Sequence, residues 1–474
     1  MTTPPIQMHL IFLLLCVSSL SHSYEAISSG KVVTYLPGVA VNPLPFHLET
    51  GYIGVGDGGV NQLFYYFAKS ERNPKEDPLV FWLVGGTRCS ALNALAAQLG
   101  PLSMDCPVEY NNGSIPTVSV NPYSWTKVAN IIFLDEPVGT GFSYSKSSHE
   151  YKMGDLRSAE NSYEFLRKWL IQNAEFQSNP LYISADSYSG QILPIIVQDV
   201  IRDVEAGKYS FLNFKGWSLG NAVTNRQLEE NAYVPFAYNM GLISYELYQS
   251  MMVNCKGNFL GFDLSNPNCS RDRQVFESLI AGILVSDVME PLCDKDKLFG
   301  APLNPKDMME TRGRRSLAKT GESFVSEKHL VPPSCSQTYS AIYMLQQWAS
   351  SEEVQKALHV REGTIKKWVR CNGELSYDRD INLNSIGYHQ NISTKGYRSL
   401  IYSGSSDMEV SHISTEAWIR TLNLSITEDW RPWSFDGQVA GYTRTFSNGL
   451  TYATVKASGH IAAVAKPKGS SNSL

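Results

Sequence analysis

The sequence lacks the features by which membrane-spanning, nucleic-acid-binding and metal-binding proteins are usually identified. Its 474 residues hold one apolar run near the N-terminus, residues 10–20, and no second long one. The net charge of −5 is small, and there is no basic run of the kind that binds nucleic acid or anionic lipid. The cysteines follow no zinc-site spacing. We therefore expect no nucleic-acid partner, no membrane association of the mature chain, no metal and no cofactor.

The apolar run of residues 10–20 predicts a signal peptide. The run is too short to span a bilayer, and Ser21 and Ser23 supply the small residues of a cleavage site after Ser23. We expect residues 1–23 to be removed and residues 24–474 to enter the secretory pathway, with an extracellular or vacuolar destination. The alternative is a buried N-terminal helix. Four Asn-x-Ser glycosylation sequons support the secretory route, at Asn112, Asn268, Asn391 and Asn423.

The cysteine content is consistent with that compartment. Cleavage after Ser23 removes Cys16 and leaves seven of the eight cysteines. Disulfides are expected in an oxidising lumen, and an odd number leaves at least one thiol unpaired or paired between chains. The seven are Cys89, Cys106, Cys255, Cys269, Cys293, Cys335 and Cys371.

Short apolar runs alternate with helical stretches, which predicts an α/β fold with a mostly parallel central sheet and helices on both faces. A large buried core is expected because charged residues make up only 18% of the chain, against a usual value of about 25%. A helix begins near Leu193, where apolar residues recur at helical spacing until Gly207. The expected strands are residues 63–67, 79–84, 131–134, 181–184, 400–403 and 452–455.

Residues 225–345 differ from the rest, because they are loop-rich, hold four of the cysteines and show no clear strand. We expect an insertion in the single domain that forms a cap over the sheet. Within it, Thr311-Arg-Gly-Arg-Arg315 is a basic cluster in a polar stretch. A solvated loop is one interpretation. The other is a processing site from which a linker of about 305–330 is excised, which splits the chain in two.

Ser187 carries the strongest indication of chemistry. The apolar strand ending at Ser184 runs directly into Ala185-Asp-Ser187-Tyr-Ser189 and then into a helix, as in the nucleophile elbow of α/β-hydrolases. Ala185 and Ser189 replace the usual glycines. In this fold the serine is followed by an acid and then a histidine. The histidine candidate is His460, and the acid is expected after the strand of residues 400–403, where the sequence reads Gly404-Ser405-Ser406-Asp407.

With these segments in view, the chain resembles plant serine carboxypeptidase-like proteins over most of its length after Ser23. It is most similar to the branch whose members act as acyltransferases with glucose esters as acyl donors. The resemblance implies an α/β-hydrolase fold, and it implies an acyl-glucose donor and an alcohol acceptor as substrates. The matching stretches are residues 44–56, 121–125, 137–144, 186–190, 429–433 and 436–444.

The resemblance also implies roles for individual residues. The backbone N–H groups of Gly86 and Tyr188 would form the oxyanion hole. Val84, Asp186 and Gln98 occupy the places where peptidases of the family bind the terminal carboxylate of their substrate. Because the side chain of Val84 cannot donate a hydrogen bond, carboxypeptidase activity is not expected.

Disulfides follow from the same resemblance. Cys89 and Cys335 match a bond between the oxyanion loop and the cap, which would hold the two pieces of a cleaved chain together. The alternative for Cys89 is a free buried thiol. Cys255, Cys269 and Cys293 match a second cluster whose pairing stays open, with Cys255–Cys269 as the expected bond.

Three departures from the family pattern bear on activity. Ser405 stands where the resemblance places the catalytic Asp, and Asp407 lies two residues further on. Thr87 and Arg88 replace a Pro and a Gly in the oxyanion loop, which changes the conformations that the backbone allows. The chain also ends fourteen residues after His460, where the family pattern continues with a helix.

Three functions therefore remain open. The first is acyl transfer through an acyl-enzyme at Ser187, impaired by Ser405 or rescued by Asp407. The second is a non-catalytic companion that assists a homologous acyltransferase. The third is a residual carboxypeptidase or esterase. A hydrogen bond between Asp407 and His460 would favour the first, and an Asp407 turned away would favour the second.

Overall fold

A computed structural model describes residues 30–106, 114–260, 265–292 and 337–462. The predicted signal peptide, Asn112, Cys293, Cys335 and the basic cluster of residues 311–315 lie outside these ranges, so the structure does not bear on them.

One mixed sheet of twelve strands organises the fold. Its six central strands are parallel to one another. All six strands expected from the sequence lie in this sheet. Its central strands are, in spatial order, β7 (Asn130–Leu134), β4 (Leu79–Leu83), β10 (Leu181–Asp186), β11 (Phe214–Gly220), β13 (Arg398–Gly404) and β16 (Leu450–Val455).

Antiparallel strands extend the sheet at both edges. Next to β7 are β3 (Asn61–Ala68), β2 (Leu48–Val55), β1 (Lys31–Val33) and β8 (Tyr144–Ser145), which pairs with β3. Next to β16 are β15 (Gln438–Phe446) and β14 (Ile426–Phe435). Two small ribbons lie apart from it: β5 (Leu102–Met104) with β6 (Val118–Val120), and β9 (Met153–Gly154) with β12 (Tyr377–Asp378).

Helices cover both faces of the sheet because its central strands are apolar on both sides. Along β3, Leu63 and Tyr65 pack into one core cluster, whereas Phe64 and Tyr66 pack into the other. The first cluster lies under α3 (Asp155–Gln172), α4 (Leu193–Glu205), α11 (Ile386–Ser393) and α12 (His412–Thr421). The second lies under α2 (Leu92–Ala97), α9 (Gln337–Ser350) and α10 (Glu352–Ala357).

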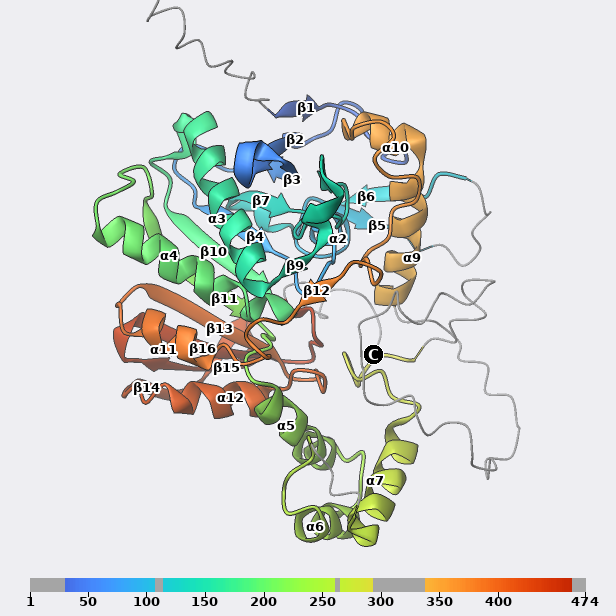
Figure 1. The fold of residues 1–474 in the computed structure, drawn as a ribbon. Helices are drawn as coiled ribbons and strands as arrows, with labels where there is room; N and C mark the ends of the chain where they lie inside the picture. Colours follow the sequence, from blue (N-terminus) through green and yellow to red (C-terminus); the bar gives the residue numbers. More distant parts are fainter. Residues whose placement is uncertain (1–29, 107–113, 261–264, 293–336, 463–474) are drawn as a thin grey trace, which may run out of the picture.

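Three helices of the predicted insertion form a unit of their own. They are α5 (Arg226–Asn239), α6 (Tyr245–Asn254) and α7 (Pro267–Ile280), at the bottom of the view in Figure 1. Their apolar side chains make a separate cluster that also takes in Met408 from the main domain. We call these helices with residues 281–292 the cap. The helix α9 packs instead against α2 and against β5 of the small ribbon. Among the described helices, none is long and apolar enough to cross a bilayer.

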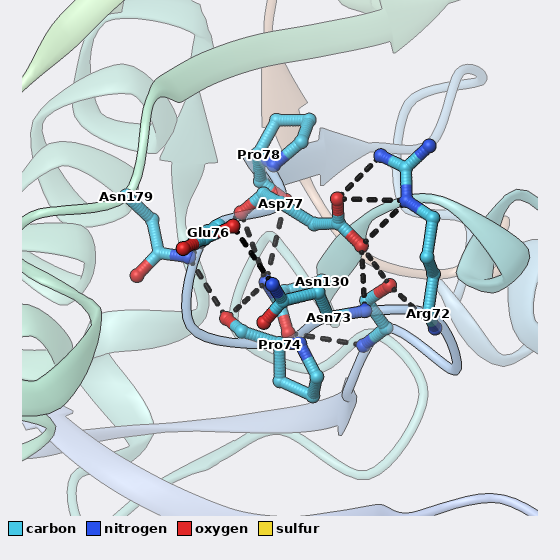
Figure 2. A network of polar contacts seen from close by, with 9 residues as sticks. Arg72, Asn73, Pro74, Glu76, Asp77, Pro78, Asn130 and Asn179 are labelled. Atoms are coloured by element: carbon cyan, nitrogen blue, oxygen red, sulfur yellow. Dashed lines mark hydrogen bonds and ion pairs between the residues drawn. The ribbon is translucent and has the colours of Figure 1, made fainter.

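A polar network fixes the start of β4, at the end of the sheet opposite the strand termini that carry the site (Figure 2). The Asp77 carboxylate accepts from Ser70 Oγ at 2.6 Å and pairs with Arg72. The Nδ2 groups of Asn130 and Asn179 both donate to the carbonyls of Pro74 and Asp77. These contacts satisfy the backbone of the loop between β3 and β4, so that loop is ordered without secondary structure of its own.

Candidate active site

Ser187 lies in a sharp turn between β10 and α4. Its φ of 51° is in the left-handed region, and residues Ser187–Gly190 form a short 3-10 helix. The turn closes because its neighbours are small: a Cβ on Gly85 would lie 2.3 Å from Ser187 Cβ, and one on Gly190 would lie 2.6 Å from the Val223 carbonyl. Val223 N donates to Ser187 O at 2.9 Å and holds the turn. Such strain is typical of a functional turn.

Three side chains from separate strand ends meet at this turn. His460 Nε2 lies 2.7 Å from Ser187 Oγ, and His460 Nδ1 lies 2.7 Å from Asp407 Oδ2. Asp407 follows β13 and His460 follows β16, so the parallel sheet brings the three together at one edge. All three are buried. A neutral imidazole that donates from Nδ1 to Asp407 and accepts the serine proton at Nε2 satisfies both contacts.

Ser405, which stands where the resemblance places the catalytic Asp, contacts the backbone after β16, whereas Asp407 contacts the imidazole. The Ser405 hydroxyl accepts a hydrogen bond from Ala457 N at 3.0 Å and ties the loop after β13 to the loop after β16. The chain turns between Gly404 and Asp407, where Asp407 N donates to Gly404 O at 3.4 Å. It is therefore the second residue after Ser405 that faces the imidazole.

Asp407 is held by more than the histidine. Its Oδ2 also accepts from Asn221 Nδ2 at 2.7 Å, and its Oδ1 accepts from the backbone N–H groups of Glu409 and Val410. Asn221 accepts from Gly404 N in turn. Sequence reasoning missed Asn221, although its place directly after β11 puts it at the same edge of the sheet as the other site residues.

Electrostatics around His460 favour the protonated imidazole. Burial alone lowers the pKa of His460, but the Asp407 carboxylate outweighs burial and raises that pKa to about 9, with smaller contributions from Glu409 and Asp186. The carboxylate thus stabilises the imidazolium that forms when a serine gives up its proton.

The oxyanion loop, residues 85–89, is fastened to the segment of residues 370–375. Arg88 adopts a φ of 69°, and its Nη1 donates to the carbonyls of Gly373 and Leu375 at 3.2 and 2.6 Å. Asn372 N donates to Arg88 O, and Ser90 N donates to Arg370 O. The arginine therefore supplies side-chain contacts that a glycine at this φ could not make.

The predicted disulfide between Cys89 and Cys335 is corrected, because Cys89 is bonded to Cys371. The backbone pairing on either side of Cys89 brings Cys371 directly opposite it. The second predicted bond, Cys255–Cys269, is present and joins the end of α6 to the start of α7.

The three residues at the carboxylate-binding places of the peptidases differ in surroundings. Asp186 is buried, and its Oδ1 accepts from Gly85 N at 2.5 Å. Burial raises the pKa of Asp186, although the Gly85 N–H and the nearby cations lower it. The side chain of Val84 packs in the apolar cluster beneath α2. Gln98 is buried at the end of α2, and among the described residues no hydrogen bond joins it to Asp186.

The other predicted surface sites are accessible. Asn268, Asn391 and Asn423 are exposed, as attachment of a glycan requires.

Gly86, predicted with Tyr188 to form the oxyanion hole, has a φ of 73° and packs against Cys89, where a Cβ would lie 2.5 Å from Sγ. Among the described residues no cluster of His, Cys, Asp and Glu is arranged to hold a metal ion.

A nucleophile elbow, a Ser–His–Asp hydrogen-bond chain and a mixed sheet with six parallel central strands and helices on both faces define an α/β-hydrolase. The serine carboxypeptidase family model matches residues 37–474, and the chain belongs to that family.

Two relatives from Arabidopsis thaliana are similar over nearly the whole chain. Serine carboxypeptidase-like 13 is 43% identical over 458 residues, which cover 96% of this chain and 95% of the relative. Serine carboxypeptidase-like 8 is 42% identical over 439 residues, which cover 93% and 92%. A solved structure, a prohormone-processing carboxypeptidase from Saccharomyces cerevisiae, shares the fold with a TM-score of 0.68 at 17% identity, covering 92% of each chain.

Proposed function

We propose that the protein is an acyltransferase that forms an acyl-enzyme at Ser187, taking the acyl group from a glucose ester and passing it to an alcohol. The observation that carries this proposal is the unbroken chain of hydrogen bonds from Asp407 through His460 to Ser187. All its members are buried, so water competes little for these contacts.

The reaction has two balanced halves. Ser187 Oγ attacks the ester carbonyl while its proton moves to His460 Nε2, and the N–H groups of Gly86 and Tyr188 stabilise the oxyanion. Glucose then leaves as an alcohol with the proton from His460. In the second half, His460 takes the proton of the acceptor hydroxyl, whose oxygen attacks the acyl-enzyme and releases the serine with that proton. Asp407 holds the imidazole and stabilises its charged form throughout.

Two features favour ester donors over peptides. The side chain at Val84 offers no donor to a peptide's terminal carboxylate, and Asp186 already accepts the Gly85 N–H. While Asp186 is ionised, a substrate carboxylate brought beside it would meet a like charge, which costs binding energy. Release of C-terminal residues from blocked dipeptides at acid pH would contradict this assignment.

A non-catalytic companion role has less support than catalysis. It was motivated by the apparent loss of the triad acid and by the altered oxyanion loop. Asp407 contacts the imidazole, and Arg88 anchors the loop through two carbonyls. Co-purification with a homologous acyltransferase, together with an unreactive Ser187, would revive that role.

A fluorophosphonate probe tests the proposal directly, because it reacts with a serine whose base is in place. We expect purified protein to be labelled at Ser187 and the Ser187→Ala variant to be unlabelled. Incubation with acyl-glucose esters and alcohols should then release glucose and form new esters, and Ser187→Ala should do neither. Absence of labelling in folded protein would refute the proposal.

A further inference from the structure

A short segment of the cap, residues 284–289, contacts both loops that carry the base and its acid. We call it the strap. Val285 O accepts from the backbone N–H groups of Met408 and Glu409 at 2.9 and 3.1 Å, and Val288 N donates to Ser406 O at 3.0 Å. The strap is thus paired with the residues on either side of Asp407.

The strap also pairs with the histidine loop. His460 N donates to Ser286 O at 2.7 Å, so the residue that carries the imidazole is bonded through its own backbone. Packing here is close, since a Cβ on Gly459 would lie 2.5 Å from both Ser286 O and Asp287 Cβ. The two loops touch each other as well, because a Cβ on Gly404 would lie 2.1 Å from Gly459 O.

One side chain of the strap reinforces these backbone contacts. Asp287 Oδ1 accepts from Ser406 Oγ at 2.7 Å and from Met289 N at 3.1 Å. Ser406 directly precedes the triad acid. On the other side of that acid, Met408 is buried in the apolar cluster of α5–α7. Asp407 therefore lies between two residues that are both anchored in the cap.

We propose that the strap is a positioning element for the triad and that Asp287 is its principal positioning side chain, which makes the cap part of the catalytic apparatus as well as a cover. This inference rests on the proposed function, because the strap acts through the base of Ser187. Its physical basis is that a displacement of about 1 Å in a catalytic group can cost roughly 10²-fold in rate. The strap holds both loops against such a displacement.

The test compares the rates at which a fluorophosphonate labels Ser187, measured well below the melting temperature of every variant. Asp287→Ala removes the acceptor for Ser406 Oγ, and we expect labelling to slow by roughly tenfold to 10²-fold. Asp287→Asn keeps an acceptor oxygen and should restore most of the rate. A matched control is Asp272→Ala. It removes a carboxylate that accepts hydrogen bonds from Ser250 and Asn254, both of which lie within the cap rather than on the triad loops. It should lower thermal stability and leave the labelling rate unchanged.

A second readout separates positioning from stability. If Asp287→Ala lets His460 move from Asp407, the rate should reach its plateau at lower pH than in the wild type. If the wild type is labelled, and Asp287→Ala and Asp272→Ala are labelled at the same rate, the inference is overturned. If the wild type is not labelled at all, the proposed function fails. The strap is then judged by NMR titration of the His460 imidazole in wild type and Asp287→Ala, where equal pKa values would refute it.

Discussion

Asp407 is fully buried and accepts hydrogen bonds from His460, Asn221 and two backbone N–H groups. These four donors fix the carboxylate in the plane that the imidazole needs. The proposed chemistry therefore depends on Asp407, which lies two residues beyond the position where the resemblance places the acid, and single substitutions can separate the roles of Ser405 and Asp407.

We expect Asp407→Asn to lower the rate of Ser187 labelling by about 10⁴-fold, the loss seen when a triad acid elsewhere is replaced by its amide. Because Asp407 raises the pKa of His460, the rate of the residual reaction should reach its plateau at lower pH in this variant. Rates measured from pH 4 to about pH 10.5, which extends past the pKa of His460 in the wild type, test both parts.

Ser405→Ala provides the comparison, since among the described residues the Ser405 side chain makes a single hydrogen bond, from Ala457 N. Its labelling rate should stay within about tenfold of the wild type. A large loss in Ser405→Ala, with little loss in Asp407→Asn, would contradict the assignment of Asp407 as the residue that holds His460.

Glu229 provides a prediction about stability. Burial raises its pKa from 4.5 to about 7, although the N–H groups of Thr224 and Asn225 lower it. The folded chain therefore holds the Glu229 proton more tightly than the unfolded chain. The free energy of unfolding gained from this tighter binding is fully present below about pH 4.5 and is lost as pH rises through about 7. Glu229→Gln should remove this dependence, which is on the order of 2 kcal/mol between pH 5 and pH 8.

Urea unfolding at those two pH values measures the effect. The wild type should lose more stability between them than Glu229→Gln does. Equal losses would show that Glu229 titrates near its ordinary pKa in the folded protein.

Among the elements, the oxyanion loop depends on a contact made by one long side chain. Arg88→Gly relieves a positive φ but removes both hydrogen bonds from Nη1 to the carbonyls of Gly373 and Leu375. We expect Ser187 labelling to slow by less than the roughly 10²-fold loss of a whole oxyanion donor, with kcat for acyl transfer falling more than KM rises. Arg202→Ala, on the exposed side of α4, is the control and should change neither. A faster Arg88→Gly variant would mean that strain outweighs anchoring.

The elements found and missed from sequence differ in a physical way. The six expected strands are continuous apolar runs: five lie among the parallel central strands, and the sixth, β3, is next to them. The strand β11 was missed because it contains Gly216 and Gly220, which close packing requires: a Cβ there would lie 1.9 Å from Arg398 O and 2.5 Å from Tyr402. The strand β14 was missed because it is exposed over almost its whole length, which leaves no apolar alternation to read.

The site shows the same division. Ser187 and His460 were identifiable because each follows an apolar strand in the order that the fold requires. The choice between Ser405 and Asp407 depends on how the chain turns after Gly404, and the partner of Cys89 depends on backbone pairing with a segment 282 residues away. The pattern of residues near Ser405 or near Cys89 in the sequence specifies neither that turn nor that pairing.

At the scale of the whole molecule, the disulfide between Cys89 and Cys371 spans the predicted linker of about 305–330. Cleavage within residues 311–315 by trypsin should therefore yield two pieces that migrate together in denaturing gels without reductant and separate with it. In Cys371→Ser the pieces should separate under both conditions. A cleaved wild type that separates without reductant would contradict the pairing.

The distance along the chain between Ser187 and His460, 273 residues, also sets an order of events during synthesis. At translation rates of roughly 5–20 residues per second, the serine precedes its base by about 14 to 55 s. Asn221, the strap and Asp407 emerge in that interval, in that order. While it is being made, the nascent polypeptide therefore carries Ser187 without its hydrogen-bond partner His460, and on the proposed mechanism no acyl-enzyme can form until β16 and the loop after it have been added.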